Sequence, residues 1–578
     1  MFVFFNILSL ISLTVPFLIG HFFLHWDFLG VDFPLGIGLL LQFVIGIPIL
    51  FYQHGIERDK RTVISVGYFL LFAGLSGSFL AGKTLWLPIF WELSSVGSLL
   101  VYLGQGLNKA AVRSYASLMT ASGVSSILLA GWAILPEGSI GLFFLIFALL
   151  IKSAYSVFHI WYPEFHAGSP PHLSAAYSGI AINVPLLLFM KFVFPAWHVP
   201  IFLKILVIVS GLGVFIGGIT AFFSKDIKVT FAYSTIEKAN FLWLCIFLAS
   251  IWINDANEDI AKIGKYFLIL FYLTMIHHSV SKAFQFLSFG SVTRLSGTNN
   301  IDASRGYGRL TGISLLLLGL GTFSFAVLPG TPGFISESTY LFVISKIIEM
   351  PANSGKVLLP SLIFIMIGII LGGNAHIRIY LTTVFSMPEK RAEMVPLGER
   401  EKKYIQLSLY ILGGLLFLIP VLFYGVFHYY WMGLGNLFNE FSSEWYDKIF
   451  WVSILCVVFY ATIISFRWAH RIEKRRLWDC GNQYRGTELS IRSSVVSEPL
   501  FNSIGKLINS EDGTSNFDKW IFQGIEKFLN LGRFWAGKTE SGEVANYIGF
   551  SALAMLLSLA FLFLLKFYKE LLWIFSIQ

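Results

Sequence analysis

Residues 139–193 contain two apolar segments on either side of a break. The first begins SIGLFFLIFALLIK and reaches Lys152, and the second reads PHLSAAYSGIAINVPLLLFMKFV from Pro171. Each lies in a span of about 20 residues, the length that crosses a bilayer. Pro163, Gly168 and Pro170 interrupt the backbone between them, and irregular backbone at membrane depth is tolerated only where protein buries it or a cavity borders it. The pattern therefore predicts membrane helices separated by a functional break.

The composition of the whole chain supports this interpretation. Of 578 residues, 56% are apolar and 13% are charged, whereas soluble domains are about 25% charged. The sequence therefore predicts an all-α polytopic membrane protein and excludes a soluble multidomain one. The net charge of +8 is expected in cytoplasmic loops, with no nucleic-acid partner. Three cysteines are too few for an iron–sulfur cluster, so no cofactor is expected in this chain.

About fifteen segments have the ~20 mostly apolar residues that a crossing needs. They lie near residues 3–23, 35–53, 63–82, 84–105, 114–135, 139–158, 172–193, 204–223, 229–252, 264–289, 308–330, 357–385, 405–430, 449–467 and 545–567. The segment 333–349 is interpreted as an interfacial or broken piece because it is short and carries Glu337, Lys346 and Glu349. With that choice all clusters of basic residues fall on one side, which by the positive-inside rule predicts a cytoplasmic N-terminus and an external C-terminus.

Ionisable side chains within these segments are the candidate functional residues, because a charge at the bilayer centre costs roughly 2.5–3.5 kcal/mol. They are Glu92, Lys152, Glu237, Lys238, His277, His278, Lys282, His376 and Arg378. Each has a structural alternative, since a lysine near a helix end can extend to the headgroups and a lone glutamate can be a satisfied structural carboxylate. For Glu92 and Lys152 we prefer function, because Lys152 precedes a break and not a basic loop. Adjacent His277 and His278 point about 100° apart on a helix, so no metal site is predicted.

Several short motifs resemble a known family. They are FWEL (90–93), IKSA (151–154), FHIWYP (158–163), HAGSP (166–170), DIK (226–228), AYSTIE (232–237), KA (282–283), GSV (290–292) and GFISE (333–337). Together they are similar to the antiporter-like, proton-conducting membrane subunits of respiratory complex I, of Mrp-type antiporters and of membrane-bound NiFe hydrogenases. WDCG (478–481) and SEPL (497–500) are most similar to the large antiporter-like subunit of formate hydrogenlyase and hydrogenase-4.

The resemblance implies two inverted five-helix repeats, near 84–222 and 223–390, each with a broken helix. Residues 1–83 and 391–468 would add further membrane helices, 469–544 would form a polar segment, and 545–578 would hold a C-terminal crossing. Apolar residues at helical spacing near 515–535 predict an amphipathic helix, which could be the family's lateral helix. The resemblance also implies the inner (cytoplasmic) membrane of a prokaryote.

In this family, a buried acid–base relay carries protons. The resemblance assigns that relay to Glu92, Lys152, Glu237, His278, Lys282 and Arg378, with His166, Asn183, Lys238, His277, Glu337 and His376 as possible accessory residues. The chain departs from the family at Asn183, where a second lysine is common, and at Lys238, where an uncharged residue is usual. In the late broken helix the basic residue is Arg378, which does not release its proton at accessible pH.

Three functions are compatible with these features. The first is a cation-translocating subunit of a complex-I-like or hydrogenase-type oxidoreductase, with iron–sulfur, NiFe or NADH-dehydrogenase-like partner subunits. The second is an antiporter-like subunit of a non-redox complex, for Na⁺/H⁺ antiport or inorganic-carbon uptake. The third is a structural membrane anchor with a decayed proton path. In none of them is the chain expected to be an enzyme by itself.

Overall fold

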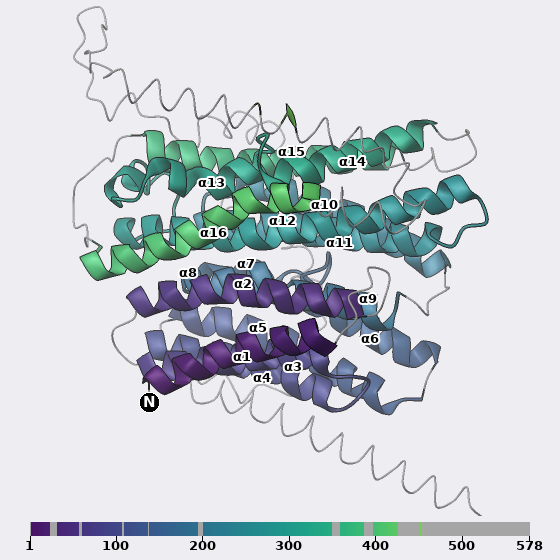
Figure 1. The fold of residues 1–578 in the computed structure, drawn as a ribbon, viewed down its shortest axis with the longest axis horizontal. Coiled ribbons are helices and arrows are strands. Elements are labelled where there is room, and N and C mark those ends of the chain that lie inside the picture. Colours follow the sequence, from purple (N-terminus) through teal and green to yellow (C-terminus); the bar gives the residue numbers. More distant parts are fainter. Residues whose placement is uncertain are drawn as a thin grey trace, which may run out of the picture. The chain divides into compact units, whose positions relative to one another are not determined.

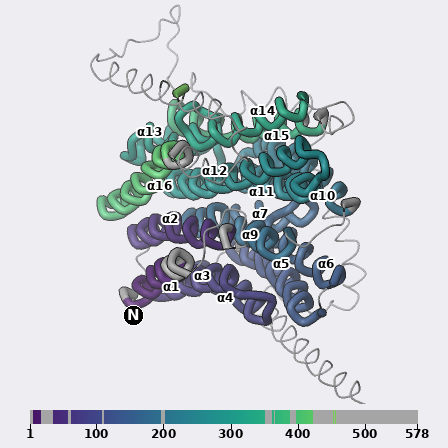
Figure 2. Tube along the Cα trace, turned by 45° about the vertical axis from the view of Figure 1, so that its right-hand side comes forward, coloured from purple at the N-terminus to yellow at the C-terminus, as the bar shows by residue number. Residues whose placement is uncertain are grey.

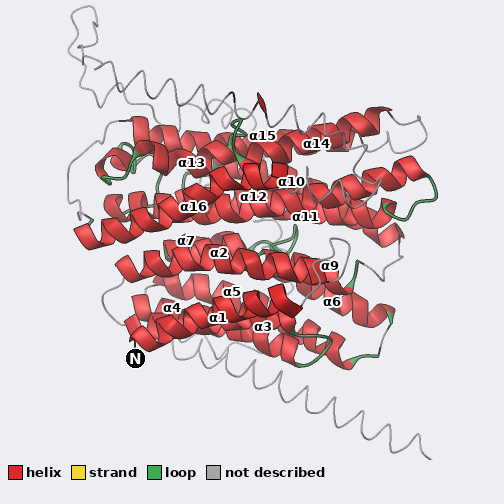
Figure 3. Cartoon of the chain, viewed as in Figure 1, coloured by secondary structure: helices red, strands yellow, loops and turns green. Residues whose placement is uncertain are grey.

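The computed structural model describes residues 2–23, 32–56, 61–106, 109–136, 138–194, 200–349, 359–386 and 397–425, together with Trp451, Val452 and Leu455. Within these residues the regular structure is helical (Figure 3), apart from one isolated β-bridge between Asp226 and Asn300. Ten of these helices are long and apolar enough to cross a membrane. The all-α polytopic membrane fold is therefore confirmed.

The described residues form two compact units, 2–194 and 200–425. The helices of the first unit are α1 (Phe2–Phe23), α2 (Asp32–Ile56), α3 (Arg61–Leu80), α4 (Trp86–Gln105), α5 (Lys109–Ile134), α6 (Ser139–Lys152), α7 (Trp161–Gly168), α8 (Pro171–Ala176) and α9 (Asn183–Phe192), with a π-turn at Tyr177–Ala181. Within this unit α3 packs along α4 (Figure 1). Gly74 makes this approach possible, because a Cβ there would collide with the backbone of Phe90 and Ser94 on α4.

The second unit contains α10 (Pro200–Phe223), α11 (Ile227–Trp252), α12 (Glu258–Ser296), α13 (Leu315–Phe325), α14 (Pro332–Glu349), α15 (Leu359–Tyr380) and α16 (Glu399–Gly425), with a 3₁₀ turn at Tyr307–Leu310 and a π-turn at Leu381–Phe385. Here α10 packs against both α11 and α15 (Figure 2), and α12 packs against α11, α13, α14 and α16. Asn257 caps the start of α12 by accepting hydrogen bonds from the next turn. Because four other helices pack against it, the long helix α12 is the central element of this unit.

Each unit contains one broken helix. Helix α6 ends at Lys152, and Ala154 and Val157 then take φ values of 52° and 80°. Helix α13 ends at Phe325, and Val327 takes a φ of 60° before α14 begins. A positive φ is uncommon outside glycine and does not continue a right-handed helix.

These breaks correct two predicted spans. The helix expected at 139–158 stops at Lys152, and the one expected at 308–330 is only Leu315–Phe325. In the second case Gly312, with a φ of 69°, ends the preceding turn before the helix can begin. The segment 333–349 lies in α14, the second half of a broken helix and not one of the ten long apolar spans.

Several predictions lie outside the described residues. They are the crossings at 449–467 and 545–567, the amphipathic helix near 515–535, the polar segment 469–544, and the motifs at 478–481 and 497–500. The number of crossings and the inverted repeats therefore remain predictions.

Candidate functional site

In the first unit, an acid and a base meet through a serine hydroxyl. Glu92 comes from the second turn of α4, Ser122 and Ser126 from one face of α5, and Lys152 from the last residue of α6. The Ser122 hydroxyl donates to Glu92 Oε1 at 3.0 Å, and Lys152 Nζ donates to Ser122 Oγ at 2.6 Å. Ser126 also donates to Glu92 Oε1. A hydroxyl is both donor and acceptor, so Ser122 links the carboxylate to the ammonium.

The Lys152 ammonium is shielded from solvent, since the residue is only 6% exposed. A second hydroxyl, Ser95 Oγ on α4, accepts from Nζ at 2.9 Å, and the Trp91 ring centroid lies 5.8 Å away. Ser95 and Ser122 also contact each other at 2.6 Å. We call Glu92, Ser95, Ser122, Ser126 and Lys152 the serine-bridged cluster. Its charges are separated by groups that can relay a proton.

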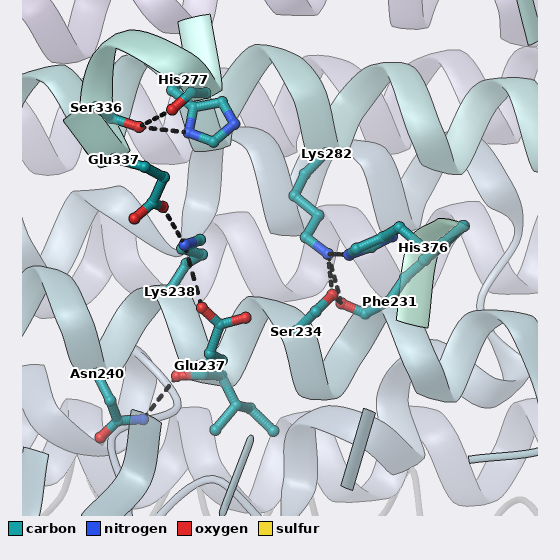
Figure 4. Close-up of polar contacts among 12 residues, drawn as sticks. Phe231, Ser234, Glu237, Lys238, Asn240, His277, Lys282, Ser336, Glu337 and His376 are labelled. Atoms are coloured by element: carbon teal, nitrogen blue, oxygen red, sulfur yellow. Dashed lines mark hydrogen bonds and ion pairs between the residues drawn. The ribbon is translucent and has the colours of Figure 1, made fainter. Parts of the chain in front are cut away.

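In the second unit, a lysine lies between two carboxylates. Lys238 Nζ is 2.7 Å from Glu337 Oε1 and 3.2 Å from Glu237 Oε1 (Figure 4). Glu237 and Lys238 are consecutive on α11, whereas Glu337 comes from the start of α14 beyond the break. Their side chains are 1%, 4% and 12% exposed. We call these three residues the ion triad; with both carboxylates charged its net charge is −1.

Glycine provides the space for this triad. A Cβ at Gly372 on α15 would collide with the carboxylate of Glu237. A Cβ at Gly217 on α10 would lie 2.8 Å from the backbone nitrogen of Glu237. Helices α10 and α15 thus enclose Glu237 closely, which fixes its carboxylate toward Lys238.

Lys282, on α12, has a different environment. Its ammonium donates to the Phe231 carbonyl at 3.1 Å and to the Ser234 hydroxyl, and lies 3.4 Å from His376 Nε2 (Figure 4). It also sits 4.5 Å from the ring centroid of Phe325, the last residue of α13. Electrostatic attraction to a ring face is stronger where water is excluded, and Lys282 is fully buried. This ammonium is thus held by neutral groups.

Histidine rings surround the same phenylalanine. His376 stacks on Phe325 with centroids 4.6 Å apart, His277 lies at 5.1 Å and His278 at 6.1 Å. The Ser336 hydroxyl on α14 lies 3.1 Å from His277 Nδ1. Phe325 therefore lies among the predicted histidines at the end of α13.

The other predicted residues lie apart from these clusters. Asn183 donates to the Gly179 carbonyl at 3.0 Å, and the His166 ring packs on Tyr162 at 4.3 Å. Arg378 donates to the backbone carbonyl of Ser224, in the turn between α10 and α11. In the structure Arg378 lies on α15, not in a helix that contains the break. The described residues include no cluster of three or more His, Cys, Asp or Glu side chains arranged to bind a metal.

The neutral partners of these charges were not among the predicted residues. Ser122 and Ser126 are spaced i, i+4 on one face of an otherwise apolar α5, and this signal was available. Ser95, Ser234 and Phe325 carry no comparable signal, because hydroxyls and aromatic rings are common in membrane helices. Their roles depend on the helices that pack against them.

Asp226, the residue directly before α11, lies outside the candidate membrane span Ile227–Trp252 and has a partly buried carboxylate. Asp226 Oδ1 accepts from the Val229 amide at 3.0 Å and caps the helix. Burial raises the pKa of Asp226 above its ordinary value, although the bond from Val229 and the charge of Lys228 oppose this. By contrast, Leu85, the residue directly before α4, provides no side-chain cap.

Comparisons with known proteins agree with this architecture. Residues 131–352 match the family described as the transmembrane part of NADH:quinone oxidoreductase and Mrp antiporters. The protein called "Putative antiporter subunit mnhA2" of Staphylococcus epidermidis is 25% identical over 367 residues, covering 58% of this chain and 44% of the relative. Its counterpart in Staphylococcus haemolyticus is 24% identical over 392 residues, covering 62% and 48%. The matched region thus spans about half the length of these curated relatives.

Solved structures share the fold. A chain of the membrane-bound sulfane sulfur reductase, an archaeal respiratory membrane complex, aligns with a TM-score of 0.58 at 15% identity, covering 92% of this chain and 88% of that one. A chain of respiratory complex I from Thermus thermophilus aligns with a TM-score of 0.52 at 18% identity, covering 72% and 85%. The fold and the match over residues 131–352 make this chain similar to the antiporter-like membrane subunits of complex I and Mrp antiporters, and they support that family.

Proposed function

We propose that this chain translocates protons through its buried acid and base side chains, as one subunit of a larger membrane complex. The observation that carries the proposal is the contact of Ser122 with both Glu92 and Lys152. Buried charges are costly and mark ion pathways more often than stability. When a hydroxyl lies between a carboxylate and an ammonium, a change in one charge still alters the protonation of the other group. No direct ion pair has to be broken.

The proposed mechanism is electrostatic switching. While Glu92 is charged and close, it stabilises the proton on Lys152. A conformational or charge change in a neighbouring subunit that neutralises or moves Glu92 removes this stabilisation, and Lys152 then releases its proton. A change of about 1.4 kcal/mol alters the protonation equilibrium tenfold. The ion triad, Lys282 and His376 would carry out corresponding steps in the second unit, with His277 and His278 as further candidates.

We infer that the driving reaction is electron transfer in partner subunits. The likeness that supports this inference is the alignment over most of both chains with a subunit of a respiratory membrane complex. Antiport without redox chemistry is the second candidate, and the similarity to the staphylococcal antiporter subunits favours it. Affinity purification through a tag on this chain distinguishes the two, because iron–sulfur or NiFe partners would co-purify only in the first case.

The test of translocation uses the purified complex in liposomes that contain a pH-sensitive dye. With a potential set by potassium and valinomycin, we expect Glu92→Gln and Lys152→Met each to lower proton flux at least tenfold. Lys191→Met is the matched control, because Lys191 also lies in the first unit but donates to the backbone carbonyls of Phe79 and Ala81. Flux that survives in both cluster variants would overturn the proposal and favour a structural anchor.

A further inference from the structure

A line of hydrogen-bonding side chains runs along one face of α4, from the serine-bridged cluster to the end of the helix. Ser95, Ser98, Tyr102 and Gln105 follow one another at spacings of three and four residues, which places them on one face. Ser95, Ser98 and Tyr102 are 0%, 0% and 1% exposed, whereas Gln105 is exposed at the C-terminal end of α4. The line therefore connects a buried ammonium with an exposed helix end.

Ser98, Tyr102 and Gln105 each have a polar partner in the residues that follow the first break. Ser98 Oγ lies 2.8 Å from Tyr177 Oη, and Tyr102 Oη lies 2.5 Å from Ser169 Oγ. These partners lie in the π-turn after α8 and directly after α7. A hydroxyl can both donate and accept a hydrogen bond, so each of these side chains can pass a proton to the next polar group.

The outer end of the line is a histidine bonded on both ring nitrogens. His172 Nε2 lies 3.0 Å from Gln105 Nε2, and His172 Nδ1 bonds to Tyr68 Oη on α3. His172 is 1% exposed and Tyr68 is fully buried. Neither residue belongs to the serine-bridged cluster, and the mechanism above does not use them.

We propose that this face of α4 is the access route by which protons reach Lys152 from the membrane side on which α4 ends at Gln105 and α5 begins at Lys109. The inference rests on the proposed function and adds the route and its direction. Successive members are one helical turn apart, about 5–6 Å between Cβ atoms, a step that a single water molecule can bridge. The route begins at Gln105 and His172, passes Tyr102 and then Ser98 with Tyr177, and ends at Ser95.

Cysteine labelling in the intact complex tests the route without relying on transport. In a background with Cys245, Cys456 and Cys480 replaced by alanine, Gln105→Cys, Tyr102→Cys and Ser98→Cys are treated with the membrane-impermeant reagent 2-(trimethylammonium)ethyl methanethiosulfonate. We expect labelling from one side of the membrane only, with rates that fall in that order. Leu100→Cys is the matched control, since it lies about 3 Å further along α4 than Ser98 and on the opposite face, and its rate should be at least tenfold below that of Ser98→Cys.

Proton flux in the same liposomes gives the second measurement. Tyr177→Phe and His172→Phe should each lower flux at least fivefold. Tyr115→Phe should not, because it alters a buried tyrosine on α5 that keeps its ring contact with Tyr102 and is not a member of the route. Equal labelling of Ser98→Cys and Leu100→Cys, with normal flux in Tyr177→Phe and His172→Phe, overturns the route alone. Normal flux in Glu92→Gln and Lys152→Met overturns the proposed function instead, so the two failures are distinguishable.

Discussion

The two units contain buried and partly buried acids and bases in different arrangements. In the first unit, Lys152 and Glu92 are linked through the Ser122 hydroxyl. In the second, Lys238 contacts Glu237 and Glu337 directly, and the second ammonium, Lys282, is surrounded by Ser234, His376 and Phe325. One unit separates its acid from its base, whereas the other pairs them.

From this difference we expect substitutions in the two clusters to have different effects. Removing one partner of a direct buried ion pair strongly destabilises the folded protein, because the other charge is left alone in a medium of low dielectric constant. A hydroxyl-bridged pair loses less, because each charge keeps other polar partners. We therefore expect the ion triad to be sensitive in stability and the serine-bridged cluster to be sensitive in transport.

The largest expected effect is on the stability of the second unit. Lys238→Met leaves two carboxylates close together without their shared cation, and removal of one member of a buried pair costs about 3–5 kcal/mol. We expect a clear fall in the thermal unfolding temperature of the purified complex, followed by the fluorescence of a dye that reacts with buried cysteine.

Lys346→Met is the control for this variant. Lys346 also contacts a carboxylate, Glu349 at 2.8 Å, but both side chains are exposed to solvent, at 36% and 62%. Such surface pairs contribute about 0–1 kcal/mol. Equal unfolding temperatures for Lys238→Met and Lys346→Met would show that the triad is not a buried structural pair.

The next effect concerns transport in the first unit. Ser122→Ala removes the hydroxyl that joins Glu92 to Lys152, and we expect proton flux to fall about tenfold, which corresponds to about 1.4 kcal/mol on the barrier. The unfolding temperature should change little. The measurement is dye-reported flux in liposomes together with a thermal scan of the same preparation.

Ser125→Ala separates this effect from the loss of any buried hydroxyl on α5. Ser125 is fully buried, and its hydroxyl donates to the backbone carbonyl of Ala148 at 2.9 Å. If both variants slow flux equally, the bridge through Ser122 has no special role and the contrast between the two units fails.

The sequence was sufficient to predict the charged members of both clusters but not their arrangement. Glu92, Lys152 and Glu237 stand out because a charge in an apolar helix needs an explanation. The pairing of Lys238 with Glu337 could not be predicted from spacing, because the two are separated by 99 residues and meet through the packing of α14 on α12, which in turn packs on α11.

The fold was predicted more accurately than the ends of its helices. Long apolar segments identify membrane helices by length alone, and α10, α11 and α15 lie where they were expected. The breaks were the weak point, because Ala154, Val157 and Val327 take positive φ values that their side chains do not favour. Surrounding structure imposes these conformations, so local sequence does not reveal where α6 and α13 end.

The smallest expected effect tests whether α11, which carries the ion triad, is held more firmly at its start than α4. Asp226→Ala removes the cap of α11 and should lower stability by about 1 kcal/mol, whereas Leu85→Ala removes no side-chain cap from α4. Asp226→Asn keeps the cap but not the charge. Because burial raises the pKa of Asp226, its ionised form costs stability once the pH rises through that pKa.

The pH dependence of the asparagine variant follows from this sign. Asp226→Asn should equal or exceed the parent chain in unfolding temperature at pH 7, where the native aspartate bears its penalty. The advantage should shrink below about pH 4, where an aspartate is protonated even in the unfolded chain. Thermal scans at both pH values measure it, and an Asp226→Asn variant as unstable as Asp226→Ala would mean that the charge itself holds α11 in place.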